Sequence, residues 1–146
     1  MSRLKTHLFI LGSMVLTSCS TMPVAELAPE SVAGRIIRLD DRRAQICECP
    51  IGSANWSAWQ SFRYGSVIDA SFDTNNQYKR TQPVGETSCM TYRKTGANTG
   101  EIRFESAEMA HTCYLNFDTP ISGTATKEGY GADNDYKQRN IQFQIK

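Results

Sequence analysis

The sequence predicts an all-β domain: a small antiparallel up-and-down β-barrel or sandwich of about 7–9 strands, stapled by disulfides. Apolar and polar residues alternate with a period of two over residues 101–105, 113–118 and 140–146. This pattern is typical of half-buried strands, because successive side chains of a strand point to opposite faces. Turn-forming residues separate many short segments, and no segment has the 3.6-residue periodicity of an amphipathic helix.

The first 18 residues have the features of a signal peptide. Arg3 and Lys5 supply two positive charges, and an apolar run follows over residues 8–16. A run of this length fits the hydrophobic region of a signal peptide and is too short to span a bilayer. The next residues, Leu16-Thr17-Ser18-Cys19, resemble the lipobox of bacterial lipoproteins, in which an aliphatic residue and two small residues precede the lipid-modified cysteine.

The lipobox resemblance implies that Cys19 is the first residue of the mature protein and carries the lipid, palmitate included. Two or three acyl chains hold a protein to a membrane more firmly than one. Ser20 follows, and in enteric lipoproteins a residue other than Asp at this place implies sorting to the outer membrane. We therefore expect a lipid-anchored envelope protein that faces the periplasm or the cell surface. The alternative is an ordinary signal peptide in which a cysteine falls at this position by chance.

The mature chain is divided into a tether and one domain. Residues 19–33 contain Pro23, Pro29 and small residues, and are predicted to form a flexible tether, with the domain over residues 34–146. Without the signal peptide the chain has 14 basic and 15 acidic side chains. This balance argues against a nucleic-acid partner, because phosphate binding requires a cationic surface.

Weaker alternation between turn signals predicts further strands over residues 35–39, 44–47, 66–72, 77–82, 88–94 and 123–127. The clearest hairpin joins residues 90–95 to residues 99–104. Gly96 and Asn98 supply the permissive backbone that its tight connection requires.

Besides the lipid-modified Cys19, the mature chain has four cysteines: Cys47, Cys49, Cys89 and Cys113. An even number in an oxidising compartment predicts two disulfides. A Cys47–Cys49 bridge would close a very small ring. Cys89 and Cys113 are expected on strands separated by a third, roughly 10 Å apart, whereas a disulfide requires Cα atoms within roughly 7 Å. We therefore expect Cys47 and Cys49 to pair with Cys89 and Cys113, in either order; a four-thiolate zinc site is the disfavoured alternative.

The sequence offers no catalytic constellation. His111 is the only histidine of the mature chain, and we expect it to be exposed near a turn. There is no Gly-x-Ser-x-Gly and no His-Glu-x-x-His motif. Asp133-Asn134-Asp135 lacks the Gly and Glu that complete a calcium loop. We expect no catalytic residue, no metal and no cofactor.

Residues 56–64 concentrate both tryptophans of the chain, with one Phe and one Tyr. Core packing is the favoured interpretation, because aromatic side chains dominate small cores. The other interpretation is a binding surface, since Trp, Tyr and Arg are enriched at binding hot spots. The binding candidates are then Trp56, Trp59, Arg63 and Tyr64.

Residues 88–146 resemble a β module found in many secreted bacterial proteins. The resemblance lies in a Tyr-x-Lys-Thr-Gly-Ala-Asn-Thr hairpin from Tyr92, a Leu115-x-Phe117 strand, Ser122-Gly123-Thr124 and a terminal Phe143-x-Ile145 strand. It implies a meandering sheet or a calycin-like barrel. Ser122-Gly123 is also similar to the Ser-Gly of the inhibitory loop in membrane-bound inhibitors of c-type lysozyme, although the aromatic that follows in that family is missing here.

The leading functional hypothesis is a non-enzymatic binding module for a small ligand or a protein partner, held to the membrane by its N-terminal lipid. An inhibitor of a host or self lysozyme is the alternative. A hydrolase is the second alternative, disfavoured by the missing constellation.

The lipid assignment predicts the outcome of Cys19→Ser. The Cys19 thiol is the nucleophile that receives the diacylglycerol, and the substitution removes it. The variant protein should therefore leave the membrane fraction or keep its signal peptide. Mass spectrometry of the mature protein and membrane fractionation check this. An unchanged mass together with unchanged fractionation would contradict the assignment.

Overall fold

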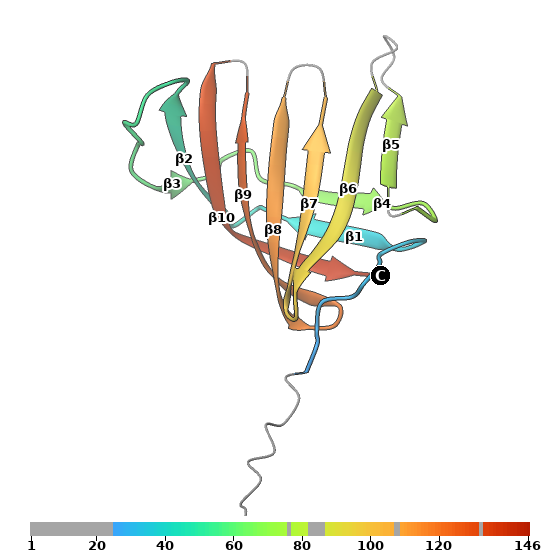
Figure 1. Cartoon of the computed structure of the whole chain (residues 1–146). Helices are drawn as coiled ribbons and strands as arrows, with labels where there is room; N and C mark the ends of the chain where they lie inside the picture. Colours follow the sequence, from blue (N-terminus) through green and yellow to red (C-terminus); the bar gives the residue numbers. More distant parts are fainter. Residues whose placement is uncertain (1–24, 76, 82–86, 107–108, 132) are drawn as a thin grey trace, which may run out of the picture.

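The computed structural model describes residues 25–75, 77–81, 87–106, 109–131 and 133–146, so the expected signal peptide and Cys19 lie outside the described residues. Within these ranges ten strands form one antiparallel sheet, in the order β3-β2-β10-β9-β8-β7-β6-β5, with β1 paired to β10 and β4 to β1 (Figure 1). The strands are β1 (Ile36–Asp40), β2 (Gln45–Pro50), β3 (Gln60–Ser61), β4 (Val67–Ser71), β5 (Gln77–Thr81), β6 (Thr87–Gly96), β7 (Thr99–Glu105), β8 (Ala110–Thr119), β9 (Ser122–Tyr130) and β10 (Asn134–Ile145).

The all-β class is therefore confirmed, with one strand more than the upper end of the expected number. Among the described residues there is no helix that could span a membrane. The described part of the sheet is open, because no pairing joins β4 to β5 there.

The long strands form a meander. β6, β7, β8, β9 and β10 each pair with the next, and the β6–β7 hairpin turns at the predicted place, with Gly96 paired to Thr99. The three segments with the cleanest alternation coincide with β7, β8 and the second half of β10. As expected, Cys89 on β6 and Cys113 on β8 are separated by β7.

β10 bends and pairs with a different strand on each side of the bend. Residues 134–139 pair with β2, and residues 142–145 pair with β1. Asn140 lies between them with a φ of 63°, and the register with β9 shifts between Gln138 and Ile141. A bulge of this kind bends a strand, and Asn tolerates the left-handed conformation. Figure 1 shows the second half of β10 running with β1 and β4 across the long strands, between their middle and their lower ends.

The bend brings β1 and β4 over one side of the meander, which we call the inner face. The apolar positions of β8 and the second half of β10 point to it, and Phe117 and Phe143 meet edge-to-face with ring centroids 4.9 Å apart. The buried core contains Ala28, Val32, Ile37, Leu39, Ala44, Ala70, Phe72, Tyr92, Ile102, Cys113, Leu115, Phe117, Ala125, Ile141, Phe143 and Ile145.

Residues 25–33, which the sequence assigns to the flexible tether, pack against the sheet. Val32 is fully buried, and the Tyr92 hydroxyl donates to the Pro29 carbonyl at 2.7 Å. Lys94 Nζ lies 2.6 Å from a carboxylate oxygen of both Glu26 and Glu30. The packed part of the chain thus includes residues before Gly34, because Leu27, Ala28 and Val32 are apolar side chains that the inner face can bury.

The core predicts a large effect for Leu115→Ala. Leu115 is only 2% exposed, so truncation should lower the free energy of unfolding by about 2–5 kcal/mol. Its neighbour Asn116 is exposed on the opposite face, and Asn116→Ala should change stability by less than about 0.5 kcal/mol. Urea unfolding measures both. Equal effects of the two substitutions would contradict this assignment of faces.

Candidate functional site

The loop between β2 and β3 folds back over the side of the sheet opposite the core, the outer face. The Ser57 backbone N–H donates to the Glu48 carbonyl at 2.9 Å, and the Cys49 thiol donates to the Ser53 carbonyl at 3.1 Å. Cys47 and Cys49 are both buried although neither belongs to the main core cluster. The loop therefore forms a second, smaller packed layer over β2 and β10.

Both tryptophans lie in or beside this loop, on the outer face. Lys137 Nζ is 4.9 Å from the centroid of the Trp56 ring, and the Arg139 guanidinium carbon is 4.3 Å from that of Trp59. The tryptophans are 41% and 38% exposed. Core packing is therefore the wrong interpretation of these two residues. Their rings stack on cations two positions apart on β10, an attraction that grows with desolvation.

Trp56 lines a cavity of about 340 Å³, which we call the Trp56 groove. Cross-strand pairing builds its floor: Arg103, Thr112, Glu128 and Lys137 are successive partners across β7, β8, β9 and β10. A second row of partners contains Ala110, Tyr130 and Asp135. Both rows lie on the outer face because cross-strand partners project to the same side.

Three of the four charged side chains that line the Trp56 groove, Arg103, Glu128 and Lys137, belong to ion pairs. Lys137 Nζ lies 3.3 Å from Glu128 Oε1, and Arg103 Nε lies 2.8 Å from Glu105 Oε1. Tyr130 remains 50% exposed. The groove thus presents exposed aromatic surface and paired charges, without an excess of either sign.

Arg63 and Tyr64 lie elsewhere. They line a smaller cavity of about 140 Å³ with Ile46, Glu48 and Phe62. Tyr64 is 86% exposed and meets Phe62 edge-on, with ring centroids 6.4 Å apart. The structure therefore divides the four binding candidates: Trp56 lines one cavity, Arg63 and Tyr64 line another, and Trp59 lies beside neither.

The inner face becomes polar toward the ends of β8, β9 and β10. Cys113, Lys127 and Gln138 are partners in one row, and His111, Gly129 and Tyr136 are partners in the next. Burial raises the pKa of Cys113 to about 11 and that of Tyr136 to about 12. Gln138 is only 4% exposed.

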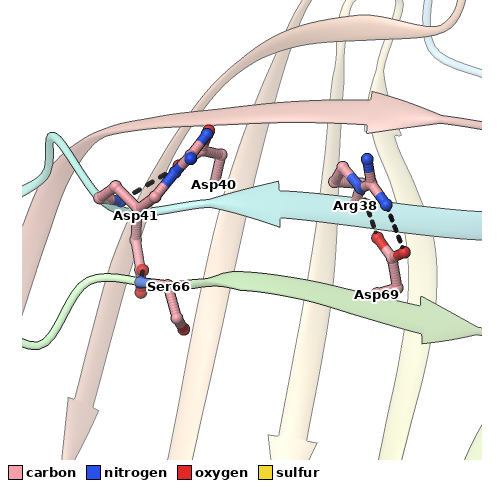
Figure 2. Close-up of polar contacts among 6 residues, drawn as sticks. Arg38, Asp40, Asp41, Ser66 and Asp69 are labelled. Carbon is pink, nitrogen blue, oxygen red and sulfur yellow. Dashed lines mark hydrogen bonds and ion pairs between the residues drawn. The ribbon is translucent and has the colours of Figure 1, made fainter.

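An ion pair crosses from the β1–β2 turn to this polar end. Lys127 Nζ lies 3.8 Å from Asp41 Oδ2, and both side chains are almost fully buried. Asp41 Oδ1 also accepts the Ser66 backbone N–H at 2.5 Å (Figure 2). Nearby on the exposed surface of β1 and β4, Arg38 makes two hydrogen bonds of 2.7 Å to Asp69.

His111 is part of β8 and is mostly buried, so the expectation of an exposed residue near a turn is wrong. Its ring stacks on Phe104 with centroids 4.6 Å apart. A Cβ at Gly129 would lie 2.5 Å from the Cβ of His111, so glycine at this position is required for the close approach. Burial and the charge of Lys127 lower the pKa of His111 to about 4. The sequence signal that was missed is that His111 is in phase with Cys113, Leu115 and Phe117.

All four cysteines are free in the structure. β2, with Cys47 and Cys49, is separated from β8 by β10 and β9, and from β6 by two further strands. Three strand spacings amount to roughly 14 Å, twice what a disulfide spans. The expected bridges to Cys89 and Cys113 are therefore not made here, because these cysteines lie on strands that the sheet keeps apart. No three metal-ligating side chains gather in the described part of the chain.

Comparison with protein-family models, with curated proteins and with solved structures finds no match to this chain.

The burial of His111 predicts a specific pH dependence. Between its ordinary pKa of 6.5 and about 4 the unfolded chain binds a proton on His111 that the folded domain does not. The free energy of unfolding should therefore fall as pH falls through this window, by about 3 kcal/mol at most, and this contribution should level off below pH 4. In the His111→Gln protein, the free energy of unfolding, measured by urea unfolding between pH 7 and pH 4, should no longer show this part of its decrease with falling pH. Identical slopes for both proteins would show that His111 is accessible to protons.

Proposed function

We propose that the protein is a lipid-anchored lipoprotein of the bacterial outer membrane and acts as a non-enzymatic binding module. Its ligand is a small molecule or a partner held in the Trp56 groove. The observation that carries this proposal is the pair of tryptophans held outside the core by Lys137 and Arg139, one of them lining a cavity of about 340 Å³. Concave sites with aromatic walls and a few placed polar groups are typical of ligand binding.

The position of the N-terminal segment supports an anchored arrangement. Leu27 and Ala28 donate their backbone N–H groups to the Ala97 carbonyl, in the turn between β6 and β7. This turn lies at the lower end of the sheet in Figure 1, whereas β9 ends and β10 begins at the upper end, beside the Trp56 groove. A lipid on Cys19 would hold the lower end toward the membrane, so the groove would open away from it.

The lysozyme-inhibitor alternative rests on Ser122-Gly123, and both residues have structural roles in the sheet. The Ser122 hydroxyl lies 2.7 Å from the Thr119 hydroxyl. A Cβ at Gly123 would collide with the Asn116 carbonyl oxygen. These contacts account for the two residues in the β8–β9 connection, so the Trp56 groove is the better-supported site.

Tryptophan fluorescence tests the groove directly, because Trp56 and Trp59 are the only tryptophans of the chain. In a Trp59→Phe protein the emission reports on Trp56 alone. Titration with fractionated envelope extract of the producing bacterium should give a saturable change in emission. The matched control is Trp56→Phe, which leaves only Trp59 and should not respond. A response of equal size in both proteins, or in neither, would contradict binding in the groove.

A lysozyme assay separates the second candidate. The proposal expects no inhibition of c-type lysozyme by the wild-type protein. Inhibition that survives Trp56→Ala would support the inhibitor function instead.

A further inference from the structure

A second groove continues the first along the outer face. It has a volume of about 350 Å³, and its polar lining consists of Thr95, Thr99, Tyr114, Asn116, Thr124 and Thr126. Thr99, Asn116 and Thr124 are cross-strand partners, as are Tyr114 and Thr126. The lining is thus an ordered array of hydroxyl and amide groups across β7, β8 and β9, without a formal charge.

The two grooves are contiguous. On β8, Tyr114 lines the second groove and Thr112, two residues away on the same face, lines the Trp56 groove. On β9, Thr126 and Glu128 have the same relationship. From Thr124 to Tyr130 this surface follows β9 for about 20 Å. It is an extended surface rather than a pocket for one compact molecule.

Exposed aromatic rings mark both parts of this surface. Tyr114 is 45% exposed in the second groove, and Tyr130 and Trp56 are 50% and 41% exposed in the first. Because Tyr130 is the partner of Ala110, four residues from Tyr114 on β8, the two tyrosines are spaced about 14 Å along the strand direction. Aromatic rings are thus separated along the surface. Thr112 and the ion pair of Glu128 with Lys137 lie between the two tyrosines, and the Thr and Asn side chains of the second groove lie beyond Tyr114.

We propose that this outer face binds a linear, uncharged, β-1,4-linked glycan that lies along β8 and β9. The inference depends on the proposed function, since it names the ligand of the same surface. The carbon–hydrogen faces of pyranose rings stack on aromatic side chains, and their hydroxyl groups pair with Thr and Asn side chains. A β-1,4-linked chain is an extended ribbon, and its shape fits a surface that follows two neighbouring strands for about 20 Å.

Other ligand classes fit this surface less well. A nucleic acid requires unpaired cations, whereas Arg103 and Lys137 are paired with Glu105 and Glu128. The core of a protein–protein interface is rich in apolar side chains and poor in charge. The linings of the two grooves instead contain Thr, Asn and charged side chains beside their aromatic rings.

Isothermal titration calorimetry tests the inference on the full protein, purified from membranes in detergent. The probes are the hexasaccharides of β-1,4-linked glucose and of β-1,4-linked N-acetylglucosamine, with α-1,4-linked maltohexaose as the negative control. We expect saturable binding of at least one β-1,4-linked probe and none of maltohexaose. Tyr114→Ala and Tyr130→Ala should each weaken binding at least about tenfold. Tyr64→Ala removes a still more exposed tyrosine, 86% exposed and outside the two grooves, and should leave binding unchanged.

Phenylalanine variants separate stacking from folding. Tyr114→Phe and Tyr130→Phe keep the rings and should retain most of the affinity that the alanine variants lose. The inference is overturned if neither β-1,4-linked probe binds, or if binding survives both alanine substitutions. If neither probe binds but the Trp56 fluorescence responds to an envelope fraction that protease inactivates, the ligand is a protein and only the glycan inference fails. If that response is also absent, the proposed function fails with it.

Discussion

The bend of β10 at Asn140 gives this strand different partners on its two sides and thereby places the layer that covers the core. On one side of the bend the strand continues the meander toward β2, and on the other side it pairs with β1. The register shift between Gln138 and Ile141 turns the strand between the two pairings. Without it β1 and β4 could not lie across the inner face, and Leu115, Phe117 and Phe143 would have no apolar layer to pack against.

The same bend divides the inner face into an apolar and a polar part. Below it, Ile141, Phe143 and Ile145 are buried with β1; above it, Gln138 and Lys127 take the corresponding inward positions. Lys127 reaches Asp41, which also binds the Ser66 backbone (Figure 2). A buried ion pair gains little net stability, but an unpaired partner is costly. Asp41 therefore favours one placement of the β1–β2 turn over the polar end. Side chains of the core and of this polar end occupy the inner face. The Trp56 groove, with its exposed aromatic rings, lies on the outer face.

The alternation of apolar and polar residues was sufficient to predict β7, β8, the second half of β10 and the β6–β7 hairpin, because these segments have one buried and one solvent-facing side. Periodicity does not reveal what covers a face. The alternation therefore could not show that residues 25–33 pack on the core, or that the 51–59 loop buries Cys47 and Cys49 on the outer side. The disulfide expectation failed for a related reason. The even number of cysteines and the expected compartment predicted that the cysteines pair, but the order of the strands in the sheet sets the distances between them. Trp56 could be singled out as a binding candidate, but its neighbours Lys137 and Glu128 come from strands far along the chain.

Cross-strand backbone contacts of β10, measured by nuclear magnetic resonance in the isotope-labelled protein, test the bend at Asn140. A bend there predicts contacts of Lys137 with Cys47 on β2 and of Phe143 with Leu39 on β1, and a left-handed backbone conformation at Asn140. Continuous pairing of β10 with β2 on both sides of Asn140 would contradict the bend, and with it the division into a filled inner face and a binding outer face.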